Sequence, residues 1–256
     1  MPRAGEPTAI DLHLLRELVK RDLAARFTGS ILGFLWAVLQ PASLIAMYAF
    51  VFTMIIPVGG GGRNYLLFLM AGLIPWIGMS EGLGRSVTSI VDNAPMVRRL
   101  PLRSAMLVIV PNASALVLEM VALAVFVVVL TVLQGWPAGL WLLPFALIAQ
   151  LLLQVGVAMF LAATYVFFRD VAQIFGFVLS VVFYLSPILY PATGRFGYLL
   201  AWNPLTPLFA LFRSAVIGAP LPSAREIVFL SIVTVAVVYG SFLFFRGAQR
   251  VFVDII

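Results

Sequence analysis

The sequence predicts an all-α integral membrane protein with a single domain over residues 1–256, and three observations carry this prediction. Hydrophobic residues make up 63% of the chain and charged residues only 10%, whereas a soluble domain is about 45–50% apolar and about 25% charged. Six apolar stretches are long enough for a membrane crossing, which takes about 20 helical residues. Most Lys and Arg residues lie at one end of those stretches. We therefore expect six transmembrane helices, an N-terminal amphipathic interface helix, and short re-entrant helices before the last span.

Composition also excludes several kinds of site. The chain has no cysteine, which excludes disulfides and thiolate metal ligands. Its only lysine, Lys20, follows Val19, so the Gly-Lys pair of a phosphate-binding P-loop is absent. We expect no catalytic residue, metal or cofactor in this chain, and a separate chain must bind any ATP that its work requires. The net charge of +6 is explained better by basic cytoplasmic loops than by nucleic-acid binding.

The first element is an amphipathic helix over residues 9–28. Four apolar residues share one helical face at spacings of three and four: Leu12, Leu15, Val19 and Leu23. The opposite face carries charged and polar residues: His13, Arg16, Glu17 and Lys20. A leucine face opposite a basic face favours a helix at the cytoplasmic membrane surface. The alternative is a helix whose apolar face packs on a partner protein.

Apolar spans follow this helix along the chain. The predicted spans cover residues 31–56, 65–89, 104–133, 140–168, 171–189 and 227–245. The outer segment 190–222 is rich in proline and has no uninterrupted apolar length for a crossing, so we expect short re-entrant or interfacial helices there. With six spans, twelve of the 16 Lys and Arg residues lie on the side of the two termini, which places both termini in the cytoplasm.

Three acidic or basic residues lie within or at the edge of the spans. Glu81 and Arg85 are four residues apart near the cytoplasmic end of the second span, which favours a local ion pair over a role in coupling. Glu119 lies in the middle of the third span and is a functional candidate by position. It could carry protons, bind a cation or pair with Arg85 or Arg213, but a structural pair or hydrogen bond is the favoured interpretation.

Aromatic residues form 13% of the chain and fall into two groups. The tryptophans near the outer span ends are typical of an interfacial belt: Trp76, Trp136, Trp141 and Trp202. Other aromatic residues lie within the first and fifth spans or just beyond them: Tyr48, Phe50, Phe52, Tyr184 and Tyr190. Aromatic faces bind the apolar faces of sugars, and tyrosine adds a hydroxyl group. A glycan-conducting pore and ordinary helix packing explain this second group equally well.

Several runs of residues together resemble a known family. Residues 21–27 (RDLAARF) and 30–41 (SILGFLWAVLQP) resemble the start of the first span in ABC-2 type polysaccharide export permeases. Similar matches follow in order at 72–76 (GLIPW), 168–171 (FRDV), 185–191 (LSPILYP) and 203–205 (NPL). The matches extend over nearly the whole chain, and as a set they are specific to this family.

The resemblance implies a homodimer of six-span subunits in a bacterial inner membrane, each paired with a separate ATPase chain that binds ATP and Mg. It also implies a coupling helix at 92–103. Without the resemblance, this basic segment would be interpreted as a plain cytoplasmic loop. The candidate coupling residues are Asp92, Met96, Arg98, Arg99 and Arg103. The implied substrates are polysaccharides on a lipid carrier, such as O-antigen for lipopolysaccharide biosynthesis, capsule or teichoic acid. By the same resemblance, the pore candidates are Tyr48, Phe52, Tyr184 and Tyr190.

Three other functions remain open at this point. A drug or small-lipid exporter has the same architecture, and this sequence does not separate it from a polysaccharide exporter. A proton-coupled secondary transporter would depend on Glu119, although such proteins usually carry a chain of intramembrane charges. A membrane-embedded enzyme has no support from a His or Cys cluster or from a close acidic pair.

Overall fold

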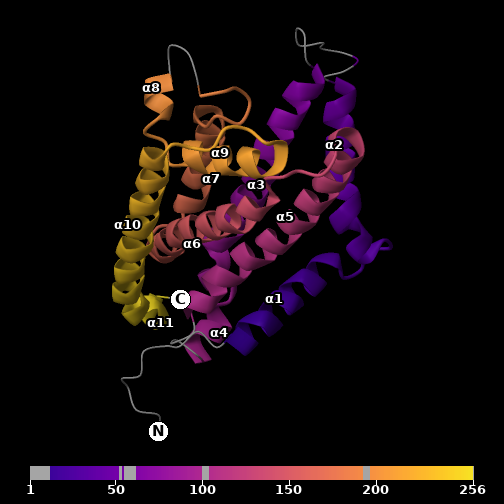
Figure 1. Ribbon diagram of the computed structural model, residues 1–256. Helices are drawn as coiled ribbons and strands as arrows, with labels where there is room; N and C mark the ends of the chain where they lie inside the picture. The colour runs from indigo at the N-terminus through magenta and orange to yellow at the C-terminus, as the bar shows by residue number, and fades with distance from the viewer. Residues whose placement is uncertain (1–11, 52–53, 55–61, 100–103, 193–196, 256) are drawn as a thin grey trace.

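The computed structural model describes residues 12–51, 54, 62–99, 104–192 and 197–255, and these residues form helices and connecting turns with no strand. The elements are α1 (Leu12–Phe27), η1 (Gly33–Leu35), α2 (Trp36–Phe50), α3 (Gly62–Asp92), α4 (Ala94–Arg99), α5 (Ser104–Gln134), η4 (Leu140–Leu142), α6 (Leu143–Phe167), α7 (Val171–Leu185), α8 (Gly197–Leu200), α9 (Leu205–Ile217), α10 (Ala224–Ala248), η5 (Gln249–Val251) and α11 (Phe252–Ile255). Figure 1 shows a bundle of long helices with α4 and α11 at its lower end and α8 and α9 at its upper end.

Five helical segments among the described residues are long and apolar enough to cross a membrane, which fits a multi-pass membrane protein. They are Gly33–Phe50, Asn64–Asp92, Ser104–Gln134, Leu140–Phe167 and Ala224–Val251, and they coincide with five of the six predicted spans. The predicted span 171–189 contains only the shorter α7, whose 15 residues reach about 22 Å at 1.5 Å per residue.

The early end of α7 has a local cause. Ser186 precedes Pro187, and the proline ring disfavours helical dihedrals in the residue before it. Ser186 is extended, with φ −103° and ψ 147°, so α7 ends at Leu185. The helix within the expected span 171–189 therefore ends four residues before residue 189.

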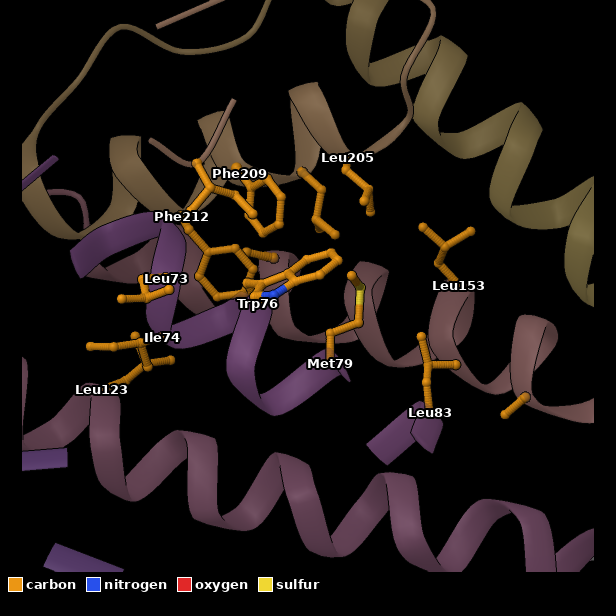
Figure 2. Packing of buried hydrophobic residues seen from close by; sticks show 14 of the residues in the cluster. Leu73, Ile74, Trp76, Met79, Leu83, Leu123, Leu153, Leu205, Phe209 and Phe212 are labelled. Carbon is orange, nitrogen blue, oxygen red and sulfur yellow. The ribbon is translucent and has the colours of Figure 1, made fainter. Parts of the chain in front are cut away.

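Helix α3 is the centre of the bundle. In its most apolar window 78% of the residues are buried, against 11% for the first span and 17% for the last. It packs against α5, α6, α7 and α9. Figure 2 shows its side chains Leu73, Trp76 and Met79 packed towards Phe209 and Phe212 of α9.

The aromatic belt was predicted correctly only in part. Trp76 is 7% exposed, and its ring centroid lies 5.6 Å from that of Phe183, so it belongs to the core. Trp136, Trp141 and Trp202 are largely exposed, as an interfacial position requires. Trp76 differs because α9 folds back over this end of α3, which the sequence pattern of α3 alone does not indicate.

The predicted coupling segment 92–103 is divided in the structure. Asp92 is the last residue of α3, and α4 covers only Ala94–Arg99. Asn93 separates the two helices: its side chain donates to the Ser89 carbonyl at 2.8 Å, and its own carbonyl accepts from the backbone of α4. Residues 100–103, including Arg103, lie outside the described part of the chain. Residues 92–99 therefore continue α3 with a single break.

Candidate functional site

Helix α1 is tied to α3 by two reciprocal ion pairs, which we call the charge clasp (Asp22, Arg26, Glu81 and Arg85). Arg26 Nη1 pairs with Glu81 Oε1, and Arg85 Nη2 lies 2.5 Å from Asp22 Oδ1. The predicted local pair between Glu81 and Arg85 is therefore wrong. Both helices carry one acid and one base four residues apart, so each charge finds its partner across the interface. The clasp connects the surface helix to the central helix of the bundle.

The rest of α1 lies against α5 along a half-buried apolar face. Leu15, Val19 and Leu23 of the predicted face are half-buried, whereas Leu12 is 75% exposed. On the exposed side Lys20 Nζ donates to Glu17 Oε1 at 2.7 Å, and this hydrogen bond and charge lower the pKa of the Glu17 carboxyl. The apolar face thus packs partly on the protein's own bundle.

Reversing one charge of the clasp should loosen α1. Arg26→Glu places a second carboxylate next to that of Glu81. We expect this repulsion to lower the thermal unfolding midpoint by roughly 2–4 °C. The double change Arg26→Glu/Glu81→Arg should recover at least half of the loss, because it restores an ion pair. Arg16→Glu on the exposed side of α1 is the matched control and should have little effect. A double variant as unstable as Arg26→Glu would refute the clasp.

Helix α4 packs against the C-terminal helix α11. Val97 is buried, Met96 is half-buried against the core, and Phe252 of α11 is fully buried with its ring centroid 5.6 Å from that of Phe245. Asp92 accepts a hydrogen bond from Thr88 Oγ1 at 2.6 Å. Arg98 and Arg99 end α4, and their side chains lie outside the described set. Met96 therefore packs α4 against the core of the bundle.

A second group of interacting residues lies at the other end of the bundle, around Arg213, and the sequence analysis does not predict it. Arg213 of α9 is 6% exposed and donates to the carbonyls of Pro187 at 2.6 Å, Ile188 at 3.2 Å and Phe68 at 3.3 Å. Its guanidinium carbon lies 3.6 Å from the ring centroid of Phe68. Gly72 leaves room for this side chain, since an added Cβ would lie 2.8 Å from Arg213 Nη2. Arg213 therefore joins α9, α3 and the segment after α7.

Two further side chains hold the same segment. Tyr65 Oη donates to the Leu189 carbonyl at 2.9 Å, and Asn203 Nδ2 donates to the Leu185 carbonyl at 3.1 Å. Among the pore candidates, Tyr190 Oη donates to the Tyr184 carbonyl, and the Tyr184 side chain is 64% exposed. The structure brings these two tyrosines together at the upper end of α7.

The remaining pore candidates lie elsewhere or outside the described residues. Tyr48 is half-buried on α2, which packs chiefly against α5, whereas α7 packs chiefly against α3. Phe52 falls outside the described part of the chain. Tyr48 and the two tyrosines at and beyond the end of α7 therefore lie on segments that pack chiefly against different helices.

Buried polar side chains form a seam between α3, α5 and α6. Gln150 Nε2 donates to Glu119 Oε2 at 2.5 Å, which matches the favoured expectation of a hydrogen bond. One turn further, Gln154 lies against Gly82, and Asn112 Nδ2 donates to Ser86 Oγ at 2.6 Å. Arg85 and Arg213, the two charged partners considered for Glu119, bind elsewhere. The i, i+4 spacing of the two glutamines in α6 was the available signal for this seam.

An open pocket adjoins the seam between α1, α2, α3 and α5. Glu119 lies in its wall together with Gly78, Leu44 and Ile77, and Arg26 and Glu81 of the clasp also line it. Its lining is mostly apolar with a few polar groups, the character of small-molecule sites in general. The pocket links the clasp to the buried carboxylate.

Comparison with known proteins identifies the family. Residues 13–217 match the profile of the ABC-2 type transporter family. The chain is 30% identical over 257 residues to the O-antigen export system permease protein RfbA of Myxococcus xanthus, covering 94% of both chains. It is 26% identical to RfbA of Klebsiella pneumoniae over 81% of this chain and 82% of the relative. It is 24% identical to the polysialic acid transport protein KpsM of Escherichia coli over 91% and 92%. With its helical bundle and its match to the family profile over most of its own length, the chain belongs to the ABC-2 type transporter family.

Proposed function

We propose that this chain is the membrane-spanning permease subunit of an ATP-driven exporter that moves a lipid-linked polysaccharide, of the O-antigen or capsule type, across a bacterial inner membrane. The observation that carries the proposal is the similarity over more than nine-tenths of the chain to proteins named for O-antigen export and for polysialic acid transport. Five long apolar helices suit such a role.

A separate ATPase supplies the energy in this proposal, in two copies that bind ATP and Mg. The chain has no Gly-Lys pair of its own to hold a nucleotide phosphate. The coupling candidates Asp92, Arg98 and Arg99 lie where α3 gives way to α4 at the lower end of the bundle. The charge bias of the loops supports a cytoplasmic position for this end and for both termini. The ATPase would then dock beside α4.

The substrate path lies between two copies of this chain in our proposal. Met47 and Phe50 of α2 and Phe177 and Tyr184 of α7 are exposed large side chains that a second subunit would cover. Tyr48, Phe52, Tyr184 and Tyr190 then contribute aromatic surface along which sugar rings slide. In the same arrangement α7 is the fifth of six crossings, and α8 and α9 are the re-entrant helices.

Motion at the ATPase can reach the bundle through α3. Only Asn93 separates α4 from α3, so a displacement of α4 acts directly on the end of the central helix. The clasp couples α1 to the same helix at Glu81 and Arg85. Helix α3 thus connects the proposed docking surface at α4, the interface helix α1 and the core that supports α9.

Removing the two basic residues of α4 tests the docking surface. We expect Arg98→Ala/Arg99→Ala to lower the amount of ATPase that co-purifies with the chain at least tenfold and to lower ATP hydrolysis by the purified pair. The control Arg246→Ala/Arg250→Ala removes two arginines near the C-terminus and should leave both quantities within twofold. Equal loss in both variants would show that total charge, not α4, governs the association. A purified chain that moves substrate without any ATPase would overturn the proposed function itself.

A further inference from the structure

Helix α4 is too short to hold its own direction. It has six residues, whereas isolated helices shorter than about 12–15 residues are marginal in water. Asn93 separates it from α3, and the backbone amides of Met96 and Val97 both donate to the Asn93 carbonyl, at 2.9 and 3.1 Å. The angle between α4 and α3 is therefore decided by the surfaces on which the side chains of α4 pack.

A helix that is remote in sequence covers α4. Of the described elements, α3 and α11 pack most extensively on it. Val97 of α4 is 1% exposed and Phe252 of α11 is fully buried, and both belong to the same hydrophobic cluster. Because α3 is joined to α4 through Asn93 alone, the contact with α11 is the one that can fix the angle of α4.

Helix α11 is itself anchored in the bundle. The Phe252 ring meets the Phe245 ring of α10 edge to face, with centroids 5.6 Å apart and an interplanar angle of 81°, an arrangement that stabilises aromatic pairs beyond their burial. Helices α11 and α10 both pack against α6. The contact between α4 and α11 is thus a second connection from the lower end of α3 to the bundle, through α10 and α6.

We propose that Phe252 is a positioning residue for the ATPase-docking surface. Its ring holds α11 against α4 and thereby fixes the direction of the helix on which Arg98 and Arg99 lie. This role rests on the proposed function, in which the ATPase docks beside α4. A displacement of α4 then acts on α10 and α6 through α11, in addition to its direct action on α3.

The first test measures the packing of α4 without the ATPase. The chain has no cysteine, so Val97→Cys places a single thiol on the buried face of α4, and its rate of reaction with a membrane-impermeant maleimide is followed in lipid nanodiscs. We expect Phe252→Ala in this background to raise the rate roughly fivefold or more, because α4 then leaves its buried position more often. Phe126→Ala is the matched control and should leave the rate unchanged. It removes an equally buried ring in the half of α5 that is remote from α4.

The second test measures the ATPase that co-purifies with the full chain and the ATP hydrolysis of the purified pair. We expect Phe252→Ala to lower both roughly fivefold, and Phe252→Leu, which keeps most of the apolar volume, to restore them. Phe126→Ala should keep wild-type values, although its cavity lowers thermal stability about as much. Should Phe252→Ala not fold, Phe252→Val leaves a smaller cavity and should change the labelling rate and the ATPase yield in the same directions.

The outcomes separate this role from the proposed function. A wild-type chain that retains no ATPase overturns the proposed function, and the positioning role with it. If the wild-type chain retains the ATPase, an unchanged labelling rate or an unchanged ATPase yield in the Phe252 variants overturns the positioning role alone. Equal losses of ATPase in Phe252→Ala and Phe126→Ala also overturn it, because general destabilisation would then be the cause.

Discussion

Arg213→Ala is expected to destabilise the folded chain by about 3–5 kcal/mol, because three backbone carbonyls lose a charged donor and the space of a large buried side chain is left unfilled. The carbonyls of Pro187, Ile188 and Phe68 would lose their donor, and the first two belong to buried residues. An unpaired buried carbonyl costs about 1–3 kcal/mol. Loss of the side chain also empties the space between Gly72 and the Phe68 ring. The thermal unfolding midpoint of the purified chain in detergent measures this directly.

The chemistry of the guanidinium group, not its charge alone, should decide the outcome. Arg213→Lys keeps a positive charge but cannot serve three carbonyls in a fixed planar arrangement, so we expect at least half of the alanine effect. Arg225→Ala removes an exposed arginine in the first turn of α10 and is the matched control, with a change below about 0.5 kcal/mol. Full stability in Arg213→Lys would show that a point charge suffices and that the three-carbonyl geometry is unimportant.

Gly139→Ala is the second change for which we expect a large effect. A Cβ at residue 139 would lie 2.2 Å from the Ser214 carbonyl oxygen and 2.9 Å from that of Ala215. Both contacts are with backbone atoms of α9, so no side-chain rotation relieves them. The turn before η4 must move away from α9, at a cost of about 2–3 kcal/mol in the free energy of unfolding. Chemical or thermal unfolding in detergent gives the number.

The control for this prediction is another glycine-to-alanine change. Gly240 lies in α10 with nothing within 4 Å of an added Cβ, and alanine is favoured over glycine inside helices by about 0.5–1 kcal/mol. We therefore expect Gly240→Ala to be neutral or slightly stabilising. If Gly139→Ala were equally harmless, the close contact between the turn before η4 and the C-terminal end of α9 would be incorrect.

The sequence could predict the long helices because their signal is local. Apolar length and flanking charges place α5 at Ser104–Gln134 and α10 at Ala224–Ala248, close to the expected 104–133 and 227–245. The end of α7 also has a local signal, because Pro187 disfavours helical dihedrals at Ser186. The two helices within 190–222 were expected from the proline pattern, but the packing of α9 against α3 was not.

The charged groups could not be assigned correctly because their partners are distant in sequence. The i, i+4 spacing of Glu81 and Arg85 suggests a mutual pair, yet their partners are 55 and 63 residues away on α1. Arg213 looks like an outer loop charge, but its partners include a carbonyl 145 residues earlier. Periodicity reports which face of a helix is apolar, and it carries no information about which other helix covers that face.

The most direct test of the central claim is the location of the polymer in cells. In a strain that keeps the ATPase and the polymer-synthesising enzymes but lacks this chain, we predict that a polymer-specific antibody labels permeabilised cells and not intact cells. The wild-type chain should restore labelling of intact cells, and a chain with Arg98→Ala/Arg99→Ala should restore it only weakly. Intact cells labelled to the same extent with and without the chain would contradict its role as the export permease.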